Sequence, residues 1–159
     1  MSPSPRHRFL AGLITLIGLG LAGAWWTTHT RTGPLNVVVI TLDTLRADRL
    51  GAYGYAAGRT PHLDALARAG ARFDAAVSTS PITGPAHAGL LTGRYPARLG
   101  VRDNATTPLP DSALTLAEML AANGYDTGGF IGAFILDRPY GFAQGFQTFD
   151  GFARVESGR

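Results

Sequence analysis

Thr83 is the residue of this sequence whose neighbours best suit it to chemistry. Gly84 and Pro85 follow it, and an Ala- and Leu-rich run continues to Leu91. Pro85 suits the first position of a helix because its missing N–H would have no partner there, and Gly84 lets the chain turn sharply beforehand. The pattern predicts that Thr83 stands just ahead of a helix.

A hydroxyl at the start of a helix lies over backbone N–H groups that have no partner within the helix. Together with the helix dipole, these groups form an anion site. Thr83 could therefore attack a phosphorus or sulfur centre while the N–H groups hold the oxygen atoms of the substrate. The alternative is that Thr83 only caps the helix, as Ser, Thr, Asp and Asn commonly do. This stretch by itself favours the cap.

The segment from Thr83 to Arg94 reads Thr-Gly-Pro-Ala-His-Ala-Gly-Leu-Leu-Thr-Gly-Arg. It resembles the nucleophile signature of the sulfatase / alkaline phosphatase superfamily, which in sulfatases reads Cys-x-Pro-Ser-Arg and continues to Leu-Leu-Thr-Gly-Arg. In this alignment Thr83 takes the place of the cysteine and Pro85 matches. Ala86 replaces the serine and His87 replaces the arginine.

Two further segments carry the same resemblance in the same order. Residues 36–48 contain Asn-Val-Val-Val-Ile-Thr-Leu-Asp-Thr and are similar to the family's first strand and its metal-binding Asp, here Asp43. Residues 60–67 resemble the family's Thr-Pro-Asn-Leu-Asp stretch. The resemblance covers about residues 36–150 and implies an α/β fold of the alkaline phosphatase type. This fold has a mostly parallel sheet with helices on both faces, and we expect only its N-terminal portion here.

Asp43 follows the β-branched apolar run from Val37 to Leu42. Such a run predicts a strand buried on both faces, as in a parallel sheet covered by helices, and in these sheets the chemistry lies at the carboxyl ends of the strands. Asp43 could ligate a cation there or cap a helix that begins at Thr44. The resemblance favours the metal ligand. Sulfatases have a second Asp where Thr44 stands, which argues against a sulfatase-type calcium site.

His87 lies four residues after Thr83, about one helical turn further on. It could donate a hydrogen bond to a substrate oxygen or to Thr83, or it could simply pack beside the helix, and both interpretations stay open. Arg94 could support the site or be a surface charge, and Thr44 is a further candidate for a supporting role. We therefore expect Thr83 and His87 to be catalytic, Asp43 and Thr83 to bind the metal, and Thr44 and Arg94 to support them.

A threonine restricts the reaction that the resemblance implies. Sulfatases convert their cysteine to a formylglycine, and a threonine cannot follow that route. Its hydroxyl would act as an alkoxide, which requires a lowered pKa that a bound cation supplies. The phosphatase, phosphodiesterase and phosphotransferase branches of the superfamily work in this way. We expect a divalent metal, zinc or manganese rather than calcium, and a phosphate ester substrate in preference to a sulfate ester.

The segment that follows residues 124–128 also favours a phosphate ester over a sulfate ester. Those residues resemble the Gly-Tyr-x-Thr segment of the family, which in sulfatases leads into Gly-Lys-Trp-His, whose Lys and His contact the sulfate. Residues 132–137 read Gly-Ala-Phe-Ile-Leu-Asp instead, so both groups are missing.

The N-terminus predicts an exported protein. Residues 9–26 are apolar and uncharged, and at about 1.5 Å per residue they just span a bilayer core. Arg6 and Arg8 precede them, which predicts a cytoplasmic N-terminus. We expect a cytoplasmic segment (1–8), a signal anchor (9–26), a linker (27–34) and a domain (35–159). The anchor would hold the protein in the inner membrane, with the domain in the periplasm or outside the cell. Cleavage after residues 22–24, Ala-Gly-Ala, would instead leave a secreted or periplasmic protein.

The composition excludes several classes of protein. The chain has 159 residues, of which 45% are hydrophobic and 21 are glycine, as expected for one globular α/β domain. It has no cysteine and therefore no disulfide or thiolate metal site. Without Arg6, Arg8 and Arg31, which lie in or beside the leader, the remaining arginines equal the 11 acidic residues, so we expect no nucleic-acid binding.

Caps, breakers and apolar runs predict the remaining elements. Thr60 as cap, Pro61 at the first position and Gly70 as stop define one helix, and the capping box that begins at Thr115 starts another, which stops at Gly124. Asp48 is expected to be a solvated or salt-bridged surface group. We expect helices at 60–70 and 115–124, short strands at 71–77 and 126–131, and a loop with three prolines at 95–114.

The family's catalytic domain is several hundred residues long and takes an Asp-His pair and further histidines from its C-terminal half. This chain has only His7, His29, His62 and His87. We expect these 159 residues alone to bind metal weakly and to turn over little. The rival interpretations are a truncated, inactive, membrane-anchored remnant or binding domain, and a secreted α/β binding domain.

Overall fold

The computed structural model describes residues 33–152. A boundary between Thr41 and Leu42 divides the chain into two units, and all the described helices and strands lie in the second. The expected leader, residues 1–26, lies outside the described residues. Among residues 33–152, every helix is too short or too polar to span a lipid bilayer.

The second unit opens with three short helices. They are η1 (Ala47–Arg49), η2 (Gly51–Tyr53) and α2 (Pro61–Ala69), and η2 packs against α2. The helix predicted at 60–70 is confirmed, with Pro61 in its first turn and Gly70 at its end. Thr60 stands at the N-cap position without capping through its side chain. Its Oγ1 donates to Asp64 Oδ1 (3.1 Å), and the same Asp64 oxygen accepts the Ala52 N–H (2.7 Å), which fastens α2 to η2.

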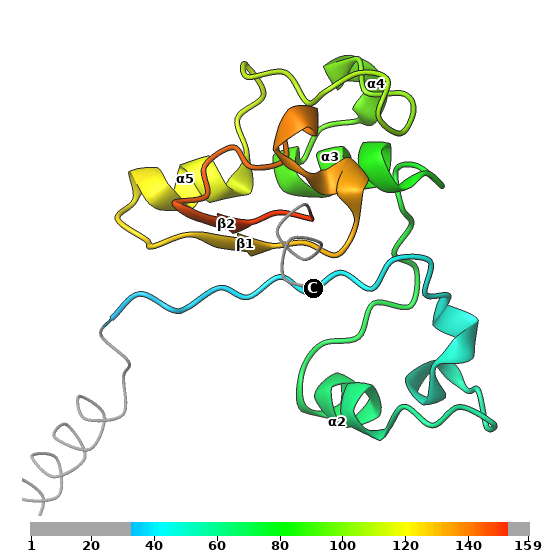
Figure 1. Ribbon diagram of the computed structural model, residues 1–159. Helices are drawn as coiled ribbons and strands as arrows, with labels where there is room; N and C mark the ends of the chain where they lie inside the picture. Colours follow the sequence, from blue (N-terminus) through cyan, green and yellow to red (C-terminus); the bar gives the residue numbers. More distant parts are fainter. Residues whose placement is uncertain (1–32, 153–159) are drawn as a thin grey trace, which may run out of the picture. The chain divides into compact units, whose positions relative to one another are not determined.

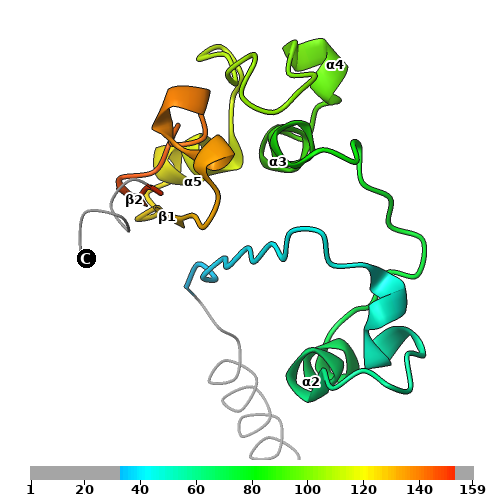
Figure 2. The same ribbon diagram turned by 45° about the vertical axis from the view of Figure 1, so that its right-hand side comes forward.

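Helix α3 (Thr83–Thr92) is the central element of the remaining chain. It contacts α4 (Pro96–Leu99), α5 (Leu116–Ala122) and η3 (Phe134–Leu136). Figure 2 shows α3 nearly end-on, with α4 and α5 on either side. The predicted loop at 95–114 was wrong in one respect, because it contains α4. Pro96 at the start of this helix and Gly100 (φ 76°) at its end explain why the chain turns helical there.

The capping box predicted at the start of α5 is confirmed. Thr115 Oγ1 accepts the N–H of Glu118 (3.1 Å), and the Glu118 carboxylate accepts the Thr115 N–H (2.7 Å). The helix ends at Ala122, and Gly124 follows with φ 82°. Local sequence alone therefore determines both ends of this helix.

The sheet has two parallel strands, β1 (Gly128–Phe130) and β2 (Thr148–Asp150), with Gly129 opposite Phe149. The connection between them includes η3 and η4 (Arg138–Tyr140), as Figure 1 shows. β1 confirms the strand predicted at 126–131, and the pairing has the parallel sense that was predicted.

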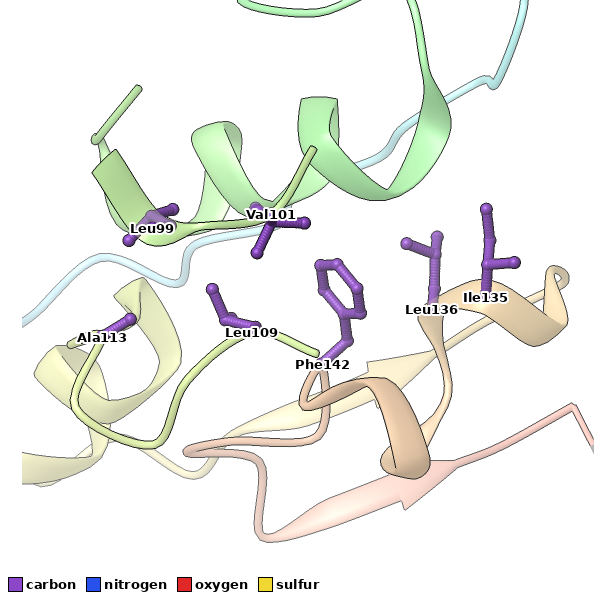
Figure 3. Packing of buried hydrophobic residues seen from close by; sticks show 8 residues of the cluster. Leu99, Val101, Leu109, Ala113, Ile135, Leu136 and Phe142 are labelled. Atoms are coloured by element: carbon purple, nitrogen blue, oxygen red, sulfur yellow. The ribbon is translucent and has the colours of Figure 1, made fainter. Parts of the chain in front are cut away.

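One hydrophobic cluster joins α3, α4, the following loop and η3 (Figure 3). Leu109, in the loop before α5, is 1% exposed, and Val101 is 2% exposed. The full cluster is Ala88, Leu99, Val101, Leu109, Ala113, Ile135, Leu136 and Phe142. Burial of these side chains fixes α3 against the C-terminal part of the described chain.

Two of the predicted strands were wrong. Residues 37–42 are extended but belong to no sheet, and Val38 (79%) and Ile40 (77%) are exposed rather than buried. Residues 71–77 contain a turn, with Val77 89% exposed. A strand needs a partner for its backbone hydrogen bonds, and the only strand pair among residues 33–152 is β1 with β2.

Candidate active site

The structure brings Asp43 and Thr83 together across forty residues of sequence. Thr83 is the first residue of α3, and Asp43 follows the extended segment of residues 34–42. Thr83 Oγ1 donates a hydrogen bond to Asp43 Oδ2 over 3.0 Å. The expected nucleophile and the expected metal ligand therefore form one hydrogen-bonded pair.

The second oxygen of the Asp43 carboxylate is also engaged. Oδ1 accepts the backbone N–H of Thr44 over 3.1 Å. Thr44 has φ 60°, in the left-handed region, which is unfavourable for a β-branched residue. Two hydrogen bonds, one from the next residue and one from α3, thus fix the orientation of the carboxylate, although Asp43 is exposed.

The first turn of α3 differs from the prediction. The helix starts at Thr83, with Ile82 as N-cap, so that Pro85 is its third residue and not its first. The reason is that the Ala86 N–H reaches the Ile82 carbonyl (2.9 Å), which adds Thr83 and Gly84 to the helix. Thr83 does not act as a side-chain cap, because its hydroxyl donates to Asp43.

The expected anion site is partly occupied by the protein itself. The Gly84 N–H donates to the side-chain oxygen Oδ1 of Asn104 over 2.8 Å. Pro85 has no N–H, and that of Ala86 is bonded within the chain. Sequence reasoning missed Asn104, because it lies twenty residues further on in a loop whose composition carries no periodic signal.

His87 contacts the backbone of Thr83. Its Nδ1 lies 2.8 Å from the Thr83 carbonyl oxygen. A carbonyl can only accept, so Nδ1 carries the proton, and in the neutral ring Nε2 is then the unprotonated nitrogen. His87 is half-buried in the first turn of α3 and holds the backbone that carries the hydroxyl.

The two expected supporting residues lie at opposite ends of α3. Thr44 is next to Asp43 and donates its N–H to it. Arg94 lies two residues after the end of α3, about 15 Å along the helix axis from Thr83, and is exposed. The structure thus brings Thr83, Asp43, Thr44 and His87 together and does not bring Arg94 to them.

The described residues supply part of a metal centre. The Asp43 carboxylate and the Thr83 hydroxyl are oxygen donors of the kind that divalent cations bind. Among residues 33–152 there is no group of three or more His, Asp or Glu side chains that could hold a metal ion. Protein metal centres use about four ligands or more, so this pair alone does not complete one.

Comparison with known proteins gives a consistent assignment. Residues 35–158 match the Sulfatase family model. Arylsulfatase A of Bos taurus is 42% identical over 122 residues, 73% of this chain and 22% of that protein. Steryl-sulfatase of Mus musculus is 35% identical over 136 residues, 79% of this chain and 22% of that protein.

Among solved structures, that of BT1596, a 2-O GAG sulfatase, aligns with a TM-score of 0.55 and 29% identity, covering 64% of this chain and 22% of that one. The alkaline-phosphatase-like fold class predicted from the sequence is thereby confirmed, with this chain as its N-terminal part. The chain spans about a fifth of the length of the curated relatives it matches.

Proposed function

The chain belongs to the sulfatase family, and from this premise we propose that it forms the N-terminal part of a metal-dependent ester hydrolase or transferase in which Thr83 is the nucleophile. One observation carries the proposal: the Thr83 hydroxyl, at the first residue of a helix, donates to the Asp43 carboxylate over 3.0 Å. Hydrolysis is the reaction class of the superfamily. The proposal adds that Thr83 is the nucleophile.

The geometry suits attack by Thr83. The hydrogen bond to Asp43 fixes where the proton of Oγ1 points, so the oxygen lone pairs face elsewhere. As Oγ1 forms its bond to the phosphorus or sulfur of the substrate, the bond to the leaving alcohol breaks. The proton of Thr83 passes to Asp43 Oδ2, which accepts it in the hydrogen bond, and the departing alkoxide takes up a proton from Asp43 or from water. Water or another acceptor then removes the covalent group from Thr83.

Asp43 and Thr83 are the residues of this chain that would hold the metal, as zinc or manganese. When bound, a divalent cation lowers the pKa of a hydroxyl that it contacts. Both donors are oxygen atoms, and they already lie within hydrogen-bond distance of one another. The other ligands of such a centre would have to come from outside residues 33–152.

We propose a phosphate ester as the substrate in preference to a sulfate ester. The relatives bear names such as arylsulfatase and steryl-sulfatase. Two features of this sequence favour phosphate. Threonine replaces the cysteine that sulfatases modify, and residues 132–137 lack the Lys and His that contact sulfate in them.

Residues 9–26 are proposed, on the sequence alone, to anchor the protein in the inner membrane with residues 35–159 in the periplasm or outside the cell. The alternative is that cleavage releases the domain. Membrane fractionation distinguishes the two, because an anchored chain remains with the membrane after washing at high salt.

Activity of three variants tests the proposed nucleophile. The chain and its Thr83→Ala and Thr83→Ser variants are assayed on 4-nitrophenyl phosphate, bis(4-nitrophenyl) phosphate and 4-nitrophenyl sulfate, with Zn²⁺ or Mn²⁺. Because the chain alone is expected to turn over little, the assay is read as presence or loss of turnover, and we expect Thr83→Ala to abolish it and Thr83→Ser to retain part of it. Full activity in Thr83→Ala would exclude Thr83 as nucleophile. No turnover by the unmodified chain on any ester would favour the inactive remnant or binding domain.

A further inference from the structure

Residues 35–42 form an extended apolar segment that belongs to no sheet. They read Leu-Asn-Val-Val-Val-Ile-Thr-Leu and contain no charged residue, proline or glycine. Successive side chains of an extended backbone point to opposite faces. Val37 and Val39, both 52% exposed, lie on one face, and Val38 (79%) and Ile40 (77%) lie on the other. The segment therefore offers two apolar faces to a partner.

The backbone of this segment is also unpaired. Among residues 33–152, no backbone hydrogen bond involves residues 35–40. Exposed extended backbone of this kind readily pairs with further strands, and proteins usually protect it with charged residues, proline or a covering element. Residues 35–42 have neither charge nor proline. Uncharged β-branched segments of about six or seven residues are also those that pair most readily with copies of themselves.

The best partner for the segment is the same segment of a second copy. Elsewhere among residues 33–152 the exposed large apolar residues stand singly along the sequence, as Val77 and Phe130 do. In parallel register each residue lies beside its own counterpart, about 4.8 Å away. Like charges placed in this way would repel, but residues 35–42 have none, and Asn36 beside its counterpart can form a ladder of side-chain hydrogen bonds. Identical segments are therefore compatible along their whole length.

The proposed membrane anchor gives the copies a common direction. The eight residues 27–34 connect the anchor to Leu35, so the segment begins within about 30 Å of the membrane surface in every copy. Anchored copies therefore meet with their segments parallel and at a similar height. Confinement to the membrane also raises their effective concentration, which favours pairing.

We propose that residues 35–42 pair, parallel and in register, with the same residues of further copies of this chain. Each strand has two edges, so the association can continue beyond a dimer, as it must for a sheet that is more than marginally stable. The inference does not depend on Thr83 being a nucleophile. It rests on the proposed anchor only for the parallel direction of the strands.

Single cysteines can map the register, because the chain has no cysteine of its own. Leu35→Cys, Val38→Cys and Leu42→Cys are each made in the whole chain, placed in liposomes and treated with a short bismaleimide. A parallel, in-register pair brings each position beside its counterpart, so we expect all three variants to be linked as dimers. An antiparallel pair centred on the segment would hold its two ends about 24 Å from their counterparts. Linkage at Val38→Cys alone would therefore contradict the parallel register.

Ala69→Cys, at an exposed residue that ends α2, measures linkage by random collision. We expect its dimer yield to be at least about fivefold lower than that of the three variants in the segment, because only the segment holds its counterparts at strand spacing. Yields at the control level at all three positions would overturn the proposal. That result would mean that another part of the same chain, or the lipid surface, covers residues 35–42.

A charge in the segment should prevent the pairing. Val38→Lys places like charges beside one another in register, so we expect it to lower the dimer yield of Leu35→Cys by at least about fivefold. Val77→Lys is the matched control, because Val77 is an equally exposed valine (89%) outside the segment, and it should leave the yield unchanged. Both valines are exposed, so neither substitution disturbs the hydrophobic cluster. Equal yields in the two lysine variants would contradict the proposal.

The possible failures can be told apart. Retention of the chain in the membrane after washing at high salt tests the anchor independently of the linkage. Linkage at all three positions in a chain that washes off would uphold the pairing and exclude the anchor. Linkage is also expected to be the same when Thr83→Ala is added, so failure of the proposed nucleophile would leave this result unchanged.

Discussion

Residues 42–78 and residues 79–152 lie in one unit but are held together in different ways. The first stretch contains no buried residue, and its ties are hydrogen bonds such as those of Asp64 with Ala52 and Thr60. The second contains the whole hydrophobic cluster, including Leu109 and Val101. The candidate site takes Asp43 from the first stretch and Thr83 from the second, so only one member of the pair stands on a packed core.

Different interactions therefore determine the positions of Thr83 and Asp43. Thr83 starts a helix whose Ala88 is fully buried, so packing determines where its hydroxyl lies. Asp43 is exposed, and two hydrogen bonds determine where its carboxylate points. Substitution of Asp43 should therefore lower turnover with little change in the free energy of unfolding. Substitution in the hydrophobic cluster should lower the free energy of unfolding.

The largest effect is expected at Asp43. Asp43→Ala removes the acceptor for Thr83, and we expect it to abolish the small turnover of the chain. The free energy of unfolding should change by less than about 1 kcal/mol, because the side chain is exposed. Asp48→Ala is the matched control, an exposed Asp five residues on that pairs with Arg46. Kinetics and urea unfolding of both variants check this. Similar turnover in the two would contradict the role of Asp43.

The next effect contrasts two leucines. Leu109 is 1% exposed, and Leu66, on α2, is 69% exposed. We expect Leu109→Ala to lower the free energy of unfolding by about 2 to 5 kcal/mol and Leu66→Ala to change it by less than about 0.5 kcal/mol. Urea titration measures both. Equal losses would show that residues 42–78 have a core of their own, and the comparison of the two stretches would fail.

A smaller effect tests packing within the second stretch. Gly145 (φ 80°) and Gly93 (φ 66°) are both left-handed, so alanine costs about 1 kcal/mol at either. A Cβ at Gly145 would also overlap the backbone of Glu118 and Ala117, whereas nothing lies near one at Gly93. Thermal unfolding should therefore show Gly145→Ala less stable than Gly93→Ala by about 1 to 3 kcal/mol. A reversed order would mean that α5 does not pack there.

The smallest effect concerns an exposed pair in the first stretch, whose surface position was predicted. Arg46 donates to both oxygens of Asp48 (2.9 and 2.7 Å), and this hydrogen bonding lowers the pKa of Asp48 below its ordinary value. Because the folded pKa is lowered, any stability from the pair is present above the ordinary pKa and is lost as the pH falls through the lowered one. NMR titration should show the pKa of Asp48 rising in Arg46→Ala. An unchanged pKa would mean that the pair does not form in solution.

Sequence reasoning succeeded where the cause is local. The Thr115 capping box, the stop at Gly124 and the helix after Thr60 depend on residues within a few positions, and all are present. The strand at 37–42 failed because a strand depends on partners elsewhere in the chain. Its apolar pattern carries no information on whether they are present.

In the candidate site, too, features with a local cause could be predicted and those that depend on distant residues could not. Asp43 and Thr83 were chosen from motifs, and a hydrogen bond joins them. The start of α3 was misplaced by two residues, because Pro85 fits the third position of a helix as well as the first. Asn104 could not be predicted, since no spacing rule links a loop residue to an N–H twenty positions earlier. The distance of Arg94 from Thr83, by contrast, follows directly from the length of the helix.

The central claim is that Thr83 Oγ1 forms the covalent bond to the substrate. Its most direct test is acid quenching of the chain during turnover of a phosphate ester with Zn²⁺ or Mn²⁺, followed by peptide mass spectrometry. We predict a phosphoryl group on Thr83, absent from Thr83→Ala. Turnover that leaves Thr83 unmodified while another residue carries the group would contradict it.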